Sequence, residues 1–139
     1  MSKWRKIGQN MSFLDKLFGE NKKEEALPKV HWLYLEETPL DEIEKISFEK
    51  PVAIFKHSTR CSISRMALKQ FENEYDVPAT AMELYFLDLL AHRSLSNEVA
   101  QRFGVEHQSP QLVLIKNGKA IYDASHSDID AEVLKQKIA

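Results

Sequence analysis

Three short apolar segments, each followed by a segment with helical spacing, constrain the fold of this chain most strongly. The apolar segments span residues 30–35, 51–55 and 83–90, and each has the length of a strand. Because helical segments separate them, the strands cannot be joined by tight turns and need crossover connections, which favour parallel pairing. The pattern predicts an α/β protein whose central sheet is buried between helices.

Asn117 and Gly118 lie between two further apolar segments, residues 111–116 and 119–124. An Asn-Gly pair in this setting is the strongest local signal for a β-hairpin, because both of its residues accept positive φ. A last segment with helical spacing follows the hairpin. The predicted order is therefore β-α-β-α-β-α-β-β-α, with a mixed central sheet and helices on both of its faces.

Capping residues predict where the helices begin and end. The residues expected at helix starts are Thr38 with Pro39, Ser94 or Ser96, and Ser127 with Asp130. Gly104 is expected to end a helix. Ile63, Ala67 and Phe71 recur every four residues, which predicts the buried face of the helix that follows Cys61.

We divide the chain into a leader, residues 1–28, and a folded domain, residues 29–139. Within the leader, residues 11–19 have the pattern of two helical turns, and a charged linker spans residues 20–25. Two turns are too short for a stable isolated helix, so this segment either docks on the domain or frays. Met11 is a second candidate for the native start.

The composition excludes several classes of protein. A formal net charge of -2 and the lack of a basic stripe argue against a nucleic-acid binder. No apolar run approaches the ~20 residues that span a bilayer, and Asp15 and Lys16 interrupt the only candidate for a signal sequence. A single cysteine rules out an internal disulfide and suits a reducing compartment. We expect a cytoplasmic protein that binds neither nucleic acid nor membrane, and its oligomeric state stays open.

Cys61 is the strongest candidate for a functional residue. It follows the predicted strand at 51–55 through a polar loop, residues 57–61, and begins a helix at the carboxyl end of that strand, where α/β proteins gather function. Backbone N–H groups at a helix N-terminus stabilise a thiolate, which is the nucleophilic form. Lys56 and Arg60 are expected to add positive charge nearby. The alternative is an inert cysteine that packs as a small apolar residue.

Ser109 and Pro110 immediately precede the first strand of the predicted hairpin. A peptide bond before proline reaches the cis form far more readily than other peptide bonds do. The trans form is also compatible with a proline at the start of a strand, because no needed donor is lost there. Periodicity alone favours the trans form.

Residues 55–64, with the sequence FKHSTRCSIS, resemble the active-site segment of the monothiol bacilliredoxin family. These are single-cysteine members of the thioredoxin superfamily that act in the bacillithiol system. Residues 96–100, 105–111 and 124–129 also resemble that family, so the resemblance covers roughly residues 30–139. It implies a thioredoxin-like fold and the removal of bacillithiol, a small thiol, from protein mixed disulfides.

The resemblance also implies roles for individual residues. Cys61 is the implied nucleophile. Pro110 is implied to be a cis-proline that shapes the groove opposite the cysteine, with the backbone of Ser109 available to pair with an extended substrate. Thr59 and Arg60 are implied to line the loop before the nucleophile.

Ser64 decides the class of mechanism, because it lies three residues after Cys61, where two-cysteine redoxins have their second cysteine. A mixed disulfide on Cys61 therefore needs an outside thiol to release it, and the Ser64 hydroxyl is a candidate donor to the thiolate. We expect bacillithiol as a co-substrate, bacillithiolated proteins and small thiols as partners, and no tightly bound cofactor. Ser62 departs from the proline expected after the cysteine, which bears on loop rigidity and redox potential.

Two other functions stay open. Single-cysteine redoxins with serine at this offset can share an iron–sulfur cluster between two protomers, and a catalytically silent domain could instead present its groove to a partner. A zinc site is a weaker hypothesis because the histidines are dispersed, and acyl transfer by His57 and Cys61 lacks any hydrolase motif. Asp88 is either a proton relay for Cys61 or an outward-facing residue at a strand end, and we favour the second.

Overall fold

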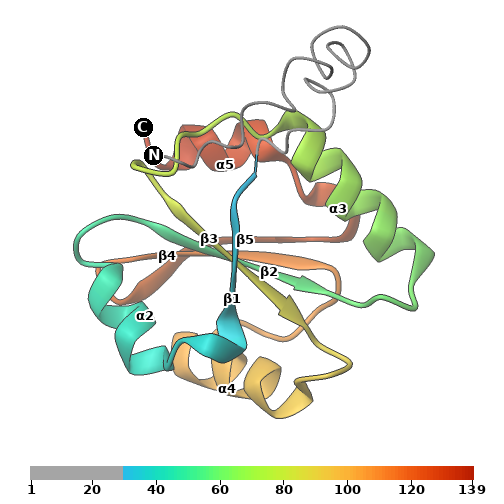
Figure 1. Cartoon of the computed structure of the whole chain (residues 1–139), viewed down its shortest axis with the longest axis horizontal. Coiled ribbons are helices and arrows are strands. Elements are labelled where there is room, and N and C mark those ends of the chain that lie inside the picture. Colours follow the sequence, from blue (N-terminus) through green and yellow to red (C-terminus); the bar gives the residue numbers. More distant parts are fainter. Residues whose placement is uncertain (1–29) are drawn as a thin grey trace, which may run out of the picture.

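The computed structural model describes residues 30–139, which form a five-stranded sheet with helices on both faces (Figure 1). The elements in chain order are β1 (Trp32–Tyr34), the 3-10 helix η2 (Leu35–Glu37), α2 (Leu40–Ile46), β2 (Val52–His57), α3 (Ser62–Glu74), β3 (Glu83–Asp88), α4 (Arg93–Phe103), β4 (Gln111–Lys116), β5 (Lys119–Ser125), the 3-10 helix η3 (His126–Asp128) and α5 (Ala131–Lys137). The helical turns expected at residues 11–19 and the charged linker lie outside the described residues. The order of strands and α-helices is the predicted one.

The strands lie side by side in the order β1-β3-β2-β4-β5. β1 and β2 both pair with β3 in parallel, whereas β4 pairs with β2, and β5 with β4, in antiparallel fashion. All six residues of the central strand β2 are buried. The predicted mixed sheet and the α/β class are therefore confirmed.

Two helical layers enclose the sheet: α3 and α5 cover one face, and α2 and α4 cover the other (Figure 1). Successive side chains of β2 enter opposite layers. Phe55 packs in one buried cluster with Phe71 of α3 and Leu134 of α5, whereas Ile54 packs in a second cluster with Val99 of α4. Because burying one such side chain stabilises a fold by about 1.5–3 kcal/mol, this alternation holds both layers on the central strand.

The first expected helix starts are shifted in the structure. Thr38 does not cap α2, because the extended residue Pro39 is the N-cap and the helix begins after it. Neither Ser94 nor Ser96 caps α4, since His92 is the N-cap and both serines lie inside the helix. Ser96 is fully buried, so its side chain serves an internal contact and not the helix end.

The end of α4 and the start of α5 follow the sequence more closely. Gly104 ends α4 in the left-handed conformation, with φ of 67°, as predicted. Asp130 caps α5, because its side chain accepts hydrogen bonds from the backbone N–H groups of Glu132 (2.8 Å) and Val133 (3.3 Å). Ser127 does not open this helix but lies in η3.

The strand boundaries also differ from the prediction. β2 continues through Lys56 and His57. The sequence predicts that the strand ends before Lys56 and that His57 begins a polar loop. Instead, both side chains are buried, with exposed fractions of 0% and 4%. The strand extends because both neighbours continue to pair with it: Lys56 lies opposite Gln111 of β4, and His57 lies beside Asp88 of β3. β3 ends at Asp88 instead of residue 90.

The hairpin between β4 and β5 forms as predicted, with φ of 54° at Asn117 and 78° at Gly118. Ser47, at the end of α2, holds this turn. Its carbonyl oxygen accepts from the N–H of Asn117, and its hydroxyl oxygen accepts from the N–H of Gly118, both at 2.8 Å. α2 therefore fixes the hairpin turn, which lies at the end of the sheet where β2 begins.

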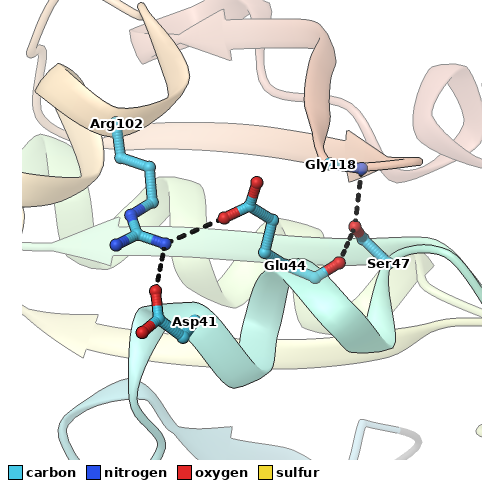
Figure 2. A network of polar contacts seen from close by, with 5 residues as sticks. All are labelled: Asp41, Glu44, Ser47, Arg102 and Gly118. Carbon is cyan, nitrogen blue, oxygen red and sulfur yellow. Dashed lines mark hydrogen bonds and ion pairs between the residues drawn. The ribbon is translucent and has the colours of Figure 1, made fainter.

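An ion-pair network ties α2 to α4 near that turn (Figure 2). Arg102 of α4 donates from Nη1 to the carboxylates of Asp41 (2.8 Å) and Glu44 (2.9 Å) of α2. These groups are largely exposed, so the network contributes orientation more than stability. Within residues 30–139, no helix is long and apolar enough to cross a membrane.

Candidate active site

Cys61 lies where β2 gives way to α3, as the sequence predicts, and its side chain is partly exposed. Its backbone is extended (φ −101°, ψ 121°), and it is the N-cap residue of α3. The Cys61 N–H donates to the carbonyl of Ser58 at 3.2 Å, and its own carbonyl accepts from the N–H of Arg65 at 3.0 Å. Cys61 is thus held at the N-terminus of α3, where backbone N–H groups of the first turn lack intrahelical partners, and it remains partly exposed.

Ser64 is fully buried and connects the first turn of α3 to the end of β2. Its hydroxyl oxygen accepts from the backbone N–H of Ser58 at 3.1 Å and lies 2.7 Å from Nδ1 of His57. Among the described residues no hydrogen bond joins this hydroxyl to the sulfur of Cys61. In the structure the serine therefore fixes the loop that carries Cys61, and the candidate hydrogen bond from its hydroxyl to the sulfur is not formed.

His57 lies beneath this loop against the ring of Phe86, with the two ring centroids 5.5 Å apart. Burial lowers the pKa of His57 below its usual 6.5, an effect opposed by the negative charge of Asp88 and supported by the positive charge of Arg65. The ring is therefore neutral near pH 7. It supplies a hydrogen-bond partner for Ser64 without placing a fixed positive charge under the site.

Thr59 and Arg60 lie in the loop before Cys61, and both are exposed. A residue that the sequence analysis did not single out stabilises this loop: Arg65 donates from Nη1 to the carbonyl oxygen of Thr59 at 3.0 Å. Arg65 lies one helical turn after Cys61, and this spacing was the available clue. The loop is thus anchored at both its buried and its exposed side.

Ser109 and Pro110 lead into β4 through a cis peptide bond. Pro110 is buried, and its carbonyl oxygen accepts from the N–H of His126 at 3.0 Å. The hydroxyl oxygen of Ser109 is buried and has no hydrogen-bond partner among the described residues. Because β4 begins beside the last residues of β2, this loop lies at the same end of the sheet as Cys61.

The arrangement matches a known family. Residues 35–134 match the family described as "Monothiol bacilliredoxin BrxC". The chain belongs to the monothiol bacilliredoxin family. The match spans most of the described residues, including Cys61, Ser64 and Pro110, so the expectation drawn from the sequence is confirmed for the family.

Solved structures support the same fold for this bacilliredoxin. A candidate oxidoreductase with a thioredoxin fold is similar at 32% sequence identity and a TM-score of 0.62, over 76% of this chain and 91% of that one. Thioredoxin from Malassezia sympodialis is similar at 23% identity and a TM-score of 0.56, over 80% and 89% of the two chains. Thioredoxin f from spinach chloroplast is similar at 16% identity and a TM-score of 0.56, over 80% and 91%. The bacilliredoxin therefore has the predicted thioredoxin-like fold and is an oxidoreductase of thiols.

The surface of α3 next to Cys61 departs from the predicted pattern. Ile63, expected on the buried face, is 58% exposed, and Met66 is 70% exposed. Together with His126 and Ile129 they border a shallow, largely apolar hollow of about 170 Å³. Ile63 lies in the first turn of α3 and belongs to neither buried cluster, whereas Phe71 further along the helix is buried as predicted.

Lys56 does not contribute charge to the Cys61 loop as expected, because its side chain enters the opposite layer of the bacilliredoxin. Its Nζ donates to the carbonyl oxygen of Ser96 at 3.2 Å and lies 3.3 Å from Nδ1 of His107. Burial lowers the pKa of Lys56 to about 8. This polar cluster is not evident from the sequence, since a lysine at the end of a strand is usually solvated.

Proposed function

We propose that this bacilliredoxin removes bacillithiol, or a closely similar small thiol, from protein mixed disulfides by means of Cys61. One observation carries the proposal: Cys61 is partly exposed at the start of α3, and the position of a second cysteine is held by the buried Ser64. The site can therefore form one mixed disulfide at a time. It has no internal thiol to resolve that bond, because Cys61 is the only cysteine of the chain.

The chemistry is a thiol–disulfide exchange in two steps. The Cys61 thiolate attacks the small-thiol sulfur of the mixed disulfide, so a new S–S bond joins Cys61 to the small thiol. The bond to the protein sulfur breaks at the same time, and that sulfur leaves with the electron pair and takes a proton from water. A second thiol, such as free bacillithiol, then attacks the adduct and releases Cys61 as a thiolate.

The fixed loop around Cys61 supports this role. Ser64 and Arg65 hold the backbone before the nucleophile from the buried and the exposed side. A rigid loop keeps the sulfur aligned with the helix N-terminus, so little reorganisation is needed when a disulfide arrives. The exposed side chains of Ile63 and Met66 offer an apolar surface for the polypeptide part of the substrate.

Intact mass spectrometry tests the proposal directly. Wild-type protein mixed with oxidised bacillithiol should gain the mass of one bacillithiol, and Cys61→Ser should gain none. In a second assay, wild-type protein with free bacillithiol should release the thiol of a bacillithiolated reporter protein, whereas Cys61→Ser should leave the rate at the background value. A wild-type protein that forms no adduct under excess oxidant would contradict the proposal.

A further inference from the structure

Two buried hydrogen-bond donors fix the tautomer of the His107 ring. Its Nδ1 lies 3.3 Å from Nζ of Lys56 and 3.2 Å from the hydroxyl oxygen of Ser96. Both Lys56 and Ser96 are fully buried. An ammonium group can only donate hydrogen bonds, so Nδ1 must accept and carries no proton. The ring proton therefore resides on Nε2.

The Nε2–H group of His107 is an available donor. The side chain is only partly buried, and among the described residues Nε2 has no hydrogen-bond partner. Burial, with the positive charges of Lys56 and Arg93, lowers the pKa of His107 below 6.5, so the ring stays neutral near pH 7. The protein thus presents one N–H donor at a fixed position.

The surroundings of this donor are positively charged. Arg93, the first residue of α4, is exposed and close enough to shift the titration of His107, and among the described residues its guanidinium forms no ion pair. Lys56 likewise has no carboxylate partner within residues 30–139. A buried ammonium without a counter-charge costs stability, and an anion nearby offsets part of that cost.

The cluster lies at the same end of the sheet as Cys61. α3 and α4 both begin at the end where β2 and β3 finish (Figure 1). His107 belongs to the loop that leads into Pro110, and Gln111 braces that loop by donating from Nε2 to the carbonyl oxygen of Glu106 at 2.9 Å. The donor therefore lies at the same end of the sheet as Cys61, on the side of α4, whereas the apolar surface lies on α3.

We propose that Nε2–H of His107 and the guanidinium of Arg93 bind a carboxylate of the small-thiol half of the substrate. The inference rests on the proposed function and specifies its substrate class: thiols that carry a carboxylate are exchanged faster than neutral thiols of the same shape. Lys56 acts only through His107, as a positioning residue that fixes the ring. The apolar surface at Ile63 and Met66 then serves the polypeptide half.

A matched pair of substrates tests this assignment. One reporter peptide is joined through a disulfide to 3-mercaptopropionate or to its neutral analogue 3-mercaptopropionamide, and release of the peptide thiol is followed with excess protein. Each rate is divided by the rate with dithiothreitol, which removes the intrinsic difference between the two disulfides. We expect wild-type protein to prefer the carboxylate by about fivefold, as one partly exposed charge-assisted contact allows.

Three variants distinguish a specific carboxylate site from a general attraction between the protein's positive charge and the substrate. Arg93→Gln and His107→Phe should each bring the ratio of the two normalised rates close to one. Lys116→Gln removes an equal charge from an exposed position at the other end of β4 and should leave the preference intact. Because a ratio is measured, partial loss of folded protein does not change it.

Three results would overturn the inference alone, and a fourth would also overturn the proposed function. Equal rates of wild-type protein on both disulfides overturn the inference and leave the proposed function standing. So does an equal loss of preference in Lys116→Gln, or a preference that follows a Glu-to-Gln change in the peptide instead of the small thiol. Wild-type protein that releases thiol from neither disulfide overturns the proposed function and the inference with it.

Discussion

Lys56 and His57 are neighbours on one strand, yet their side chains enter opposite layers of the molecule. His57 contacts Ser64 of α3 and fixes the loop that carries Cys61. Lys56 contacts Ser96 of α4 and fixes the loop that leads to Pro110. The loops that lead to Cys61 and to Pro110 are therefore held by consecutive residues of the central strand, one from each face of the sheet.

The two buried groups differ in how their polarity is balanced. His57 is neutral near pH 7 and has the hydroxyl of Ser64 as partner, and the nearby carboxylate of Asp88 partly offsets the effect of burial on its pKa. Lys56 carries a charge at pH 7 and has only neutral partners, so burial lowers its pKa to about 8. The buried polar group in the α3 layer is thus neutral and hydrogen-bonded, whereas the buried ammonium in the α4 layer has no counter-charge among the described residues.

Removing the Ser64 hydroxyl should have the largest effect on stability, because it deletes the buried contacts on the α3 side. Ser64→Ala leaves the N–H of Ser58 and the ring of His57 without their buried partner, which we expect to lower the free energy of unfolding by about 2–3 kcal/mol. Urea unfolding measures this change. Ser94→Ala, an exposed serine within α4, is the matched control and should change stability by less than about 0.5 kcal/mol. Equal losses in the two variants would mean that the buried bonds of Ser64 add little.

Lys56→Met should sharpen the α4 side through the pH dependence of stability. The pKa of Lys56 falls from 10.5 in the unfolded chain to about 8 in the folded one, so the unfolded chain binds more protons between these values. Wild-type stability therefore rises with pH, and we expect it to gain about 2 kcal/mol over Lys56→Met between pH 7 and 9.5. Tyrosine titration is common to both proteins and cancels in the difference.

The control for this measurement is Lys116→Met, which removes an exposed lysine from the far end of β4. Its stability should follow that of the wild type across the same pH range. Parallel curves for wild type and Lys56→Met would show that the ammonium of Lys56 is well solvated in the folded protein. The positive charge assigned to the α4 layer would then be wrong.

His57 should show the same sign of effect in a more acidic window. Its pKa is lowered on folding, so the unfolded chain takes up a proton more readily as the pH falls below about 6.5. Stability contributed by the neutral ring is complete above that pH and is lost as the pH falls further. Wild-type protein should thus lose more stability on acidification than His57→Gln, which still offers Ser64 a partner. His31→Gln, at an exposed position, is the control, and identical acid profiles for wild type and His57→Gln would contradict the expectation.

The sequence predicts the order of elements well because apolar periodicity and the Asn117-Gly118 turn report local geometry directly. Only the family resemblance implies that Pro110 lies opposite Cys61, and the structure has both residues at one end of the sheet because β4 pairs with β2. It does not reveal that Lys56 and His57 are buried, because their partners lie 40 and 7 residues away in α4 and α3. Long-range partners of this kind decide where a strand ends, and a polar sequence alone favours a loop.

The same limit applies to individual side chains of the site. Ser96 has the composition of a helix cap but lies inside α4, where its hydroxyl and carbonyl contact the buried cluster. Ile63 follows the apolar spacing of α3 yet is exposed, because spacing alone does not report which turns of a helix contact the core. The spacing of Arg65 from Cys61 suggests that the two residues are neighbours, but its contact with the carbonyl oxygen of Thr59 is seen only in the structure. Such roles depend on tertiary packing and not on local pattern.

Arg65→Met should produce the smallest effect of the series and should be confined to the loop before Cys61. The bond from Arg65 to the carbonyl of Thr59 is exposed, so its loss should change the free energy of unfolding by only about 0.5 kcal/mol. Amide hydrogen exchange should nevertheless become faster in the loop, at Thr59 to Cys61, while the buried amide of Ser58 remains protected by Ser64. Lys69→Met, an exposed charge on the same helix, should leave these exchange rates unchanged. If Ser58 and Thr59 lose protection together, the loop opens as one unit, and its buried and exposed anchors cannot be treated as independent.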